Sequence, residues 1–169
     1  MEKEDSRHQY YSDLLYSLAS IVKQTEKPRR MFEQVDDAVY YGYNHKHIGE
    51  GRLPSFPLSD AEMDCILRVD IDVTMRALRE LHPFASPHLL IALCSFVLQV
   101  GLPTYQQSYM YECITKEKPR LRAITSLREW VNTKGVFNYQ WARRREWEMY
   151  TIFKQQREMD KYLSFNISL

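Results

Sequence analysis

The stretch SPHLLIALCSFVLQVG, residues 86–101, decides the fold that this sequence predicts. Ser86 suits the N-cap of a helix, Pro87 suits the first helical position, and Gly101 is a natural helix end. Between these residues the predicted helix is apolar on nearly every side, and a helix that is apolar all round is buried. We therefore expect residues 86–101 to form the central helix, with the rest of the chain around it.

The sequence on both sides of this stretch has the apolar spacing of amphipathic helices. Capping-box patterns mark three further helix starts, at Ser6 with Gln9, Ser59 with Glu62, and Thr104 with Gln107. The surrounding helices predicted in this way span about residues 6–22, 28–42, 59–82, 104–114, 121–135 and 138–163. Residues 69–74 leave a choice, because Val-Asp-Ile-Asp-Val-Thr alternates with a period of two. We favour helix there, since a single strand has nothing obvious to pair with.

Composition agrees with a helical protein. A length of 169 residues is the usual size of one domain, and the low glycine count of 5 favours helix. We predict an all-α fold: a compact single-domain bundle over residues 1–169, with about six to seven helices around residues 86–101. The long C-terminal helix closes the bundle, and residues 42–57 form a long loop.

The cysteines and the N-terminus indicate an intracellular protein. Three cysteines are an odd number and show no C-x-x-C spacing, and Cys65, Cys94 and Cys113 all sit in apolar segments. This usage is typical of buried thiols in a reducing compartment. The first thirty residues contain no secretion signal, and the longest apolar run is far too short to span a bilayer. We expect the protein in the cytoplasm, with the nucleus as the alternative, and without a membrane partner.

The predicted C-terminal helix, residues 138–163, carries two stripes. Its core face is expected to hold Trp141, Arg145, Met149, Ile152, Phe153, Met159 and Leu163. The opposite side is basic and aromatic, with Arg143, Trp147, Tyr150, Lys154, Arg157 and Lys161. A second stripe of this kind needs a partner, either another helix of the same domain or another molecule.

Charge is distributed unevenly along the chain. Residues 1–117 carry 12 basic and 17 acidic side chains, whereas residues 118–169 carry 11 basic and 5 acidic ones. The cationic C-terminal third attracts an acidic partner protein, a phosphate backbone, or the acidic part of its own domain.

The loop at residues 42–57 contains apolar side chains that a solvated connection does not need. Leu53 and Phe56 stand in a rigid Leu-Pro-Ser-Phe-Pro setting, which lowers the entropy lost on docking. We expect them to contact a partner, and folding back onto the core is the equal alternative.

Motifs for metal binding are weak. His45 and His47 flank one residue, as zinc ligands do, but no further ligands accompany them. Asp70 and Asp72 share one side only if the segment is extended. We expect no metal site and no cofactor.

Arg76 and His82, with five residues between them, resemble in spacing the Arg-x4-6-His pair of the HEPN ribonucleases, an all-helical family. The resemblance covers two residues, and Ala77 stands where that family usually has a polar residue. It implies that Arg76 binds the scissile phosphate and that His82 moves a proton.

These features predict a non-catalytic intracellular accessory, regulatory or effector protein that binds an acidic face of another protein. Arg143, Trp147 and Tyr150 are the expected anchors, because Arg, Trp and Tyr dominate interface hot spots. The alternative is RNA or DNA binding, in which the cations of the same stripe contact phosphates and its aromatic rings stack on bases. A helical ribonuclease is the third hypothesis, so we do not expect an enzyme.

Overall fold

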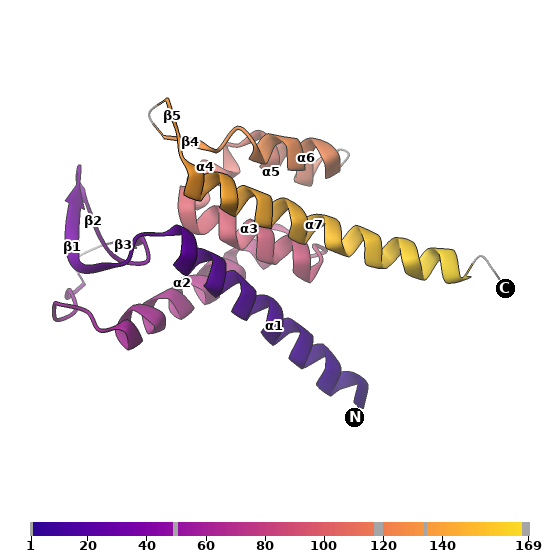
Figure 1. Ribbon diagram of the computed structural model, residues 1–169, viewed down its shortest axis with the longest axis horizontal. Coiled ribbons are helices and arrows are strands. Elements are labelled where there is room, and N and C mark those ends of the chain that lie inside the picture. The colour runs from indigo at the N-terminus through magenta and orange to yellow at the C-terminus, as the bar shows by residue number, and fades with distance from the viewer. Residues whose placement is uncertain (1, 49–50, 117–119, 134, 167–169) are drawn as a thin grey trace.

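A small antiparallel sheet lies beside a group of helices in the computed structural model of the protein (Figure 1). The structure describes residues 2–48, 51–116, 120–133 and 135–166, apart from the side chains of residues 2–8, 120, 133 and 155–166. Over these residues the chain forms seven helices and five short strands. The all-α prediction is therefore wrong, and the fold belongs to the α+β class.

Helix α3, Pro87–Val100, is the centre of the molecule, as predicted. The side chain of Ser86 accepts a hydrogen bond from the backbone N–H of Leu89, and Gly101 ends the helix with a positive φ of 84°. Leu93 and Phe96 are 1% and 0% exposed. Three long helices pack on α3, namely α1 (Glu2–Thr25), α2 (Asp60–Leu81) and α7 (Tyr139–Asn166).

Helix α2 confirms two sequence predictions. Its N-terminus has the capping box of Ser59 and Glu62, with both side chain to backbone hydrogen bonds present. The doubtful residues 69–74 lie inside this helix. Val69 and Val73, four residues apart, are exposed on one side, while Ile71 is buried on the other. The alternation therefore reflects a helix with two apolar residues in water, and not a strand.

The predicted helix over residues 28–42 is wrong, because these residues form the sheet. Strand β1 (Arg29–Val35) pairs antiparallel with β2 (Ala38–Gly42), and β2 pairs with β3 (His45–His47). Positive φ values at Asp36 and Asn44 form the two turns, a conformation that Asp and Asn tolerate. Three apolar residues that a helix here would have placed on its core face, Met31, Phe32 and Val35, are exposed to solvent.

The first strand is strongly bulged. Arg29 is opposite Gly42 and Glu33 is opposite Tyr40, so four steps along β1 face two steps along β2. A bulge of this kind bends a strand and redirects its side chains. It brings Arg29 Nε to 2.7 Å from Glu33 Oε2, a distance that two residues four apart on a regular strand do not reach.

A second, smaller core lies under the sheet. Tyr41, Leu58 and Met63 are its buried residues, and Phe56 packs against them, with its ring centroid 5.7 Å from that of Tyr41. Phe56 thus folds back onto the protein, whereas Leu53 stays 37% exposed. The long loop is also shorter than predicted, because β3 takes up part of it.

The segment between α3 and α7 departs from prediction in two places. Thr104 does not cap a helix: α4 spans Leu102–Gln106, and Ser108 caps α5, Tyr109–Thr115. The next helix, α6, spans Arg120–Leu127 and is followed by a hairpin of β4 (Asn132–Thr133) and β5 (Val136–Phe137). Gly135, with φ of 78°, permits this turn, so glycine marks a hairpin here and not a helix end.

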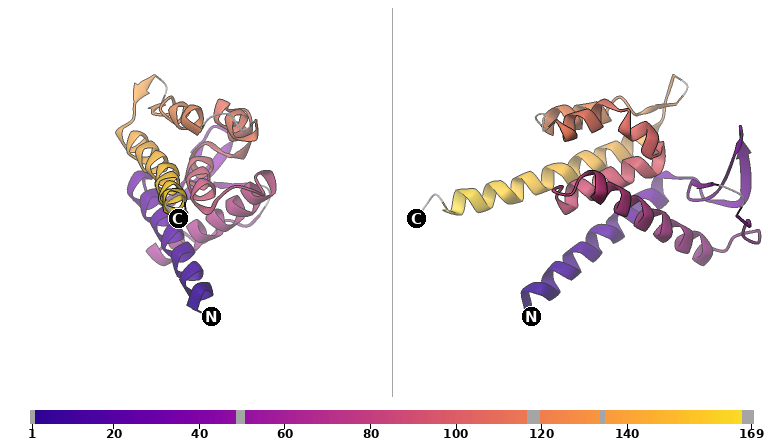
Figure 2. Two further views of the ribbon diagram at one scale, coloured as in Figure 1. Left: turned by 90° about the vertical axis from the view of Figure 1, so that its right-hand side faces the viewer. Right: turned by 180° about the vertical axis from the view of Figure 1, so that it is seen from behind.

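The free ends of α1 and α7 point away from the sheet, on the same side of the molecule (Figures 1 and 2). None of the described helices is long and apolar enough to cross a bilayer. Of the three cysteines, Cys94 and Cys113 are buried as predicted, but Cys65 is exposed.

Candidate active site

Glu26 lies at the junction of the helices with the sheet. It follows the last residue of α1, and its backbone N–H donates to Val22 O at 2.8 Å, which continues the helical pattern by one residue. Its side chain is only 11% exposed. Arg144 of α7 donates from Nη1 to Glu26 Oε1 at 2.6 Å, so the carboxyl group is fixed from the opposite helix.

Arg144 belongs to a buried charged cluster between α3 and α7. Its Nε donates to Ser95 Oγ at 3.0 Å and its Nη2 to Ser95 O at 2.5 Å. The Ser95 hydroxyl donates in turn to Glu148 Oε1 at 2.6 Å. Arg145 donates to the same carboxylate oxygen at 2.9 Å and to Gln99 Oε1 at 2.6 Å. Arg144, Arg145 and Glu148 are at most 1% exposed, so these charges depend on one another.

Burial raises the pKa of Glu26 above its ordinary value of 4.5, because the charged form loses water. The positive charges of Arg144 and Arg29 act in the opposite direction. A carboxyl group that keeps its proton at higher pH is suited to act as a general acid.

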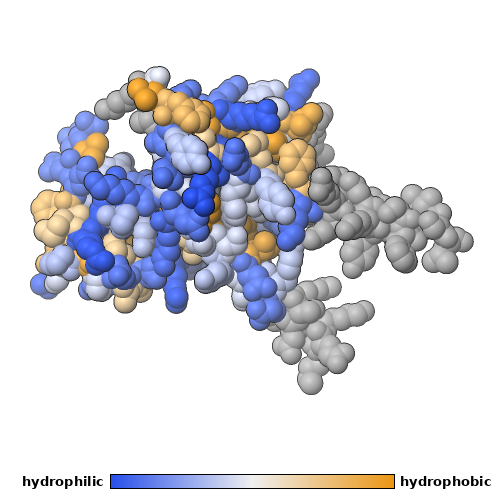
Figure 3. All heavy atoms as spheres, viewed as in Figure 1, coloured by the Kyte–Doolittle hydropathy of each residue, from blue (hydrophilic) through white to orange (hydrophobic). Residues whose placement is uncertain are grey.

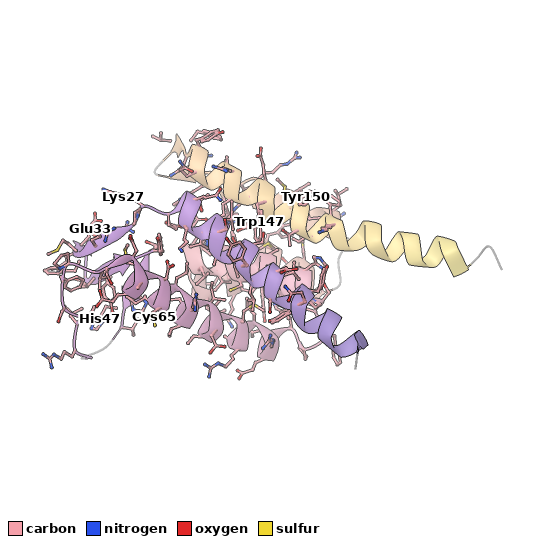
Figure 4. The ribbon with its side chains drawn as sticks, turned by 60° about the horizontal axis from the view of Figure 1, so that its bottom comes forward. Lys27, Glu33, His47, Cys65, Trp147 and Tyr150 are labelled. Atoms are coloured by element: carbon pink, nitrogen blue, oxygen red, sulfur yellow. The ribbon has the colours of Figure 1, made fainter. Side chains whose placement is uncertain are left out.

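Glu33 is a second carboxylate, and its pKa is displaced downward, opposite to that of Glu26. It is exposed on β1, beside Lys27 at the end of α1 (Figure 4). Its hydrogen bond from Arg29 holds the pKa of Glu33 below its ordinary value, with a further contribution from Lys27. Arg29 also donates to Asn44 Oδ1 at 3.3 Å, which fixes the guanidinium over the sheet. The pKa values of Glu26 and Glu33 are thus displaced in opposite directions, and the charge of Arg29 acts on both carboxyl groups.

The stripe predicted as a binding surface lies elsewhere. Arg143, Trp147 and Tyr150 line one groove of about 530 Å³ between α1 and α7. Trp147 points to α1 and donates from Nε1 to Ser17 Oγ at 3.2 Å, whereas Tyr150 is 64% exposed (Figure 4). The partner of Trp147 is therefore another helix of the same chain, which was one of the two alternatives.

Other members of both predicted stripes have mixed outcomes. Lys154 is exposed, and the side chains of Arg157, Lys161, Met159 and Leu163 lie outside the described residues. Of the predicted core face, Arg145 and Ile152 are buried, but Phe153 is 45% exposed. Glu26 is bound by Arg144, which belongs to neither predicted stripe, whereas Arg143 of the predicted binding stripe, its neighbour in the sequence, bonds to Gln24.

The ribonuclease pair is not a site. Arg76 forms an ion pair with Asp72 on the surface of α2. His82 is buried and bonds to the hydroxyl of Tyr105 at 2.7 Å, and burial lowers the pKa of His82. Among the metal candidates, His45 bonds to Asp70 at 2.8 Å, and no group of three or more metal-ligating side chains occurs in the part of the chain that the structure describes.

Sequence reasoning missed Glu26, Glu33 and Arg144, which form the candidate site. The Arg-Arg-Arg run at residues 143–145 was the available signal, since it contains the residue that binds Glu26. Arg143 was expected on the outward stripe and Arg145 on the core face, but no role was expected for Arg144, because nothing local shows that its side chain is buried.

Comparisons with known proteins give the family and the fold. The family model described as phage lysozyme matches residues 28–148, which are 121 of the 169 residues. The muramidase domain of SpmX from Asticaccaulis excentricus is similar, with a TM-score of 0.65 and 20% identity over 80% of this chain and 93% of that one.

Two bacteriophage structures are similar to a comparable degree. The active form of the P1 phage endolysin Lyz has a TM-score of 0.61 and 16% identity, over 81% of this chain and 83% of that one. A mutant of P22 lysozyme has a TM-score of 0.61 and 15% identity, over 80% and 94%. A comparison with curated proteins found no match.

The family match overturns the functional predictions. The sequence predicted a non-catalytic protein that binds another protein, with nucleic-acid binding as the alternative and a ribonuclease third. The matching family is one of lysozymes, which are enzymes, so those functions and the expectation of no enzyme are wrong. The predictions of an acidic protein partner and of a cytoplasmic or nuclear location stay predictions.

Proposed function

We propose that this chain, which belongs to the phage lysozyme family, is a glycosidase that cleaves the glycan strands of peptidoglycan. Structures that share its fold are described as a muramidase, an endolysin and a lysozyme, which supports this substrate. The observation that carries the proposal is Glu26: a nearly buried carboxyl group with a raised pKa, held by Arg144 where the sheet meets the helices.

Glu26 is proposed as the general acid. Cleavage of a glycosidic bond needs a proton on the leaving oxygen, and the sugar passes through a state that resembles an oxocarbenium ion. The proton of Glu26 goes to that oxygen as the bond to the anomeric carbon breaks. Arg144 orients the carboxyl group during this step and stabilises the carboxylate that remains.

Glu33 is proposed as the second carboxylate. It stays ionised because Arg29 donates to it, and its negative charge stabilises the positive sugar or accepts a proton from the attacking water. Arg29 acts on both carboxyl groups, since its charge also contributes to the pKa of Glu26. The bulge in β1 is what gives this chain its Arg29–Glu33 pair.

The surface near this junction suits an extended substrate. Hydrophobic residues are exposed both at the sheet and at the β4–β5 hairpin on the face that Figure 3 shows. They are Met31 and Phe32 on β1, Val136 and Phe137 on β5, and Tyr139 at the start of α7. Such side chains offer apolar contact to the faces of sugar rings along a polymer.

The experiment is hydrolysis of purified peptidoglycan, measured as the release of reducing ends. Glu26→Gln is expected to reduce kcat by about 10²–10⁴-fold, the usual contribution of general acid catalysis. Glu33→Gln is expected to reduce it as well, with KM changed less than kcat. Glu80→Gln, an exposed carboxylate on α2, is the matched control and is expected to leave the rate unchanged.

Each variant is compared with the wild type by thermal unfolding, so that loss of activity is separated from loss of folding. A folded wild-type protein that releases no reducing ends would overturn the proposal. A Glu26→Gln variant that is as active as wild type would show that the acid is another residue.

A further inference from the structure

The cluster around Arg144 contains a second glutamate that the proposed reaction does not use. Glu148 lies on α7, one turn after Arg144, and it is completely buried. A buried carboxylate costs free energy unless it is paired, and a purely structural position in a core is more often filled by an apolar side chain. Its presence beside the arginine that holds Glu26 therefore needs an explanation.

We propose that Glu148 is a positioning residue, which holds the Arg144 guanidinium on Glu26 and sets the pH range in which Glu26 acts as the acid. The inference rests on the proposed function, because it concerns the regulation of the same site. Glu148 does not touch the substrate in this account, and it acts only through Arg144 and the Ser95 hydroxyl.

Glu148 and Glu26 are connected through Ser95 and Arg144. One continuous chain of hydrogen bonds joins the two carboxyl groups: from Glu148 Oε1 to Ser95 Oγ at 2.6 Å, to Arg144 Nε at 3.0 Å, and from Arg144 Nη1 to Glu26 at 2.6 Å. Arg144 Nε also lies 3.8 Å from Glu148 Oε1. The guanidinium is thus bound on one edge by α3 and Glu148, which leaves Nη1 directed to Glu26.

Positive and negative side chains are equal in number in this cluster. Arg144 and Arg145 supply two positive charges, and Glu26 and Glu148 supply two negative charges when both are ionised. Burial raises the pKa of Glu148, while Arg145, Arg144 and the Ser95 hydroxyl favour its ionised form. Glu148 Oε1 accepts hydrogen bonds from the Ser95 hydroxyl and from Arg145, and this geometry fits the ionised carboxylate.

If the negative charge on Glu148 is removed, the buried guanidinium groups of Arg144 and Arg145 have less negative charge near them. Their field then favours the ionised form of Glu26 more strongly, so Glu26 loses its proton at lower pH. The other charged and titratable groups around the cluster are Arg29 of β1, which faces Glu26, and the Cys94 thiol of α3, whose pKa burial raises to about 12. Glu148→Gln leaves both of these groups unchanged, so neither accounts for such a shift.

Glu148→Gln is the principal variant, because it removes the charge and preserves the shape. Glu148 Oε2 has no hydrogen-bond partner among the described residues, so the glutamine NH₂ group can take that position while its oxygen keeps the place of Oε1. We expect the alkaline limb of the kcat/KM profile on peptidoglycan to move to lower pH by about 1 unit. A direct ¹³C NMR titration of the Glu26 carboxyl carbon is expected to move by the same amount.

Two further variants serve as controls. Glu146→Gln removes the same charge from the exposed side of α7, two residues earlier, and is expected to shift neither the rate profile nor the titration. Glu148→Asp keeps the charge and is expected to keep the pH profile near that of wild type. A role of Glu148 in packing alone predicts instead that Asp and Gln change stability without a shift in pH.

The failures of the two proposals are distinguishable. If wild type does not hydrolyse peptidoglycan, the proposed function fails, and the NMR titration still tests the coupling. If Glu148→Gln does not fold, Ser95→Ala replaces it: loss of the hydroxyl disfavours ionised Glu148, and a smaller shift in the same direction is expected. An unchanged Glu26 titration in the folded variant, or an equal shift in Glu146→Gln, overturns the inference.

Discussion

His82 illustrates how a single residue carries the pH dependence of stability. It caps α2, its ring bonds to the Tyr105 hydroxyl at 2.7 Å, and burial lowers the pKa of His82 below its ordinary value of 6.5. The unfolded chain therefore takes up a proton near pH 6.5, while the folded protein resists protonation. The contribution of His82 to stability is complete above pH 6.5 and is lost as the pH falls through the folded pKa.

We expect the free energy of unfolding of wild type to fall more steeply below about pH 6.5 than that of His82→Gln. Glutamine does not titrate and can still bond to Tyr105. Urea unfolding of both proteins between about pH 5 and pH 8 measures the difference, which cancels the contributions of the other histidines. Parallel curves for the two proteins would show that His82 takes its proton in the folded state as easily as in the unfolded chain.

At the residue scale, the sequence predicts what depends on local chemistry. Ser59, Ser86 and Gly101 were recognised because a cap is decided by residues within one helical turn. Arg144 and Glu148 were not, because a buried charge depends on a partner far along the chain: Ser95 is on another helix, and Glu26 is more than a hundred residues away. Residue spacing shows which side chains share one side of a helix, but it does not show whether that side is buried from solvent.

At the element scale, helix α3 was predictable because its sequence admits one solution: an apolar run with a cap at each end and no polar side to face water. The sequence of residues 28–42, in contrast, is compatible with two structures, a helix and a hairpin. Met31, Phe32, Val35 and Val39 satisfy helical spacing, but the turn at Asp36 and Asp37 and the β-branched and aromatic residues after it also satisfy a hairpin. Burial of Tyr41 against Leu58 and Met63 favours the hairpin, and the apolar spacing within the segment does not show that contact.

Helix α3 should be the element on which global stability depends most. Leu93→Ala removes a side chain that is 1% exposed, and we expect a loss of roughly 2–5 kcal/mol in the free energy of unfolding, from lost burial and the cavity that remains. Leu121→Ala on α6 makes the same chemical change at a residue that is 62% exposed, and it is expected to cost less than about 0.5 kcal/mol. Denaturant unfolding of both variants measures the two losses in the free energy of unfolding. Equal losses would mean that the core is not organised around α3.

At the scale of the whole molecule, two cores are joined by one helix. The large core surrounds α3, and the small core holds the sheet through Tyr41, Leu58 and Met63. Helix α2 contributes to both, with Met63 near its start and Leu67 to Leu78 further along. Polar contacts add to this connection, since Arg30 bonds to Asp60 and His45 bonds to Asp70. The sheet, which carries Glu33, is therefore placed relative to Glu26 mainly through α2.

This arrangement predicts that the sheet opens before the helical core unfolds, because few buried side chains hold it and stability follows local burial. Asp70→Ala removes the acceptor of the 2.8 Å bond from His45 and should weaken the attachment of the sheet to α2. We expect the amide protons of β1–β3 to exchange with solvent roughly tenfold faster in this variant, while the slowest amides of α3 keep nearly their wild-type protection. Native-state hydrogen exchange measures the exchange rates of both regions in one sample.

Asp72→Ala is the control: it breaks an exposed ion pair with Arg76 on the same helix and should change exchange in neither region. If Asp70→Ala accelerates exchange equally in the sheet and in α3, the two regions unfold as one unit, and the position of Glu33 relative to Glu26 depends on the stability of the whole molecule.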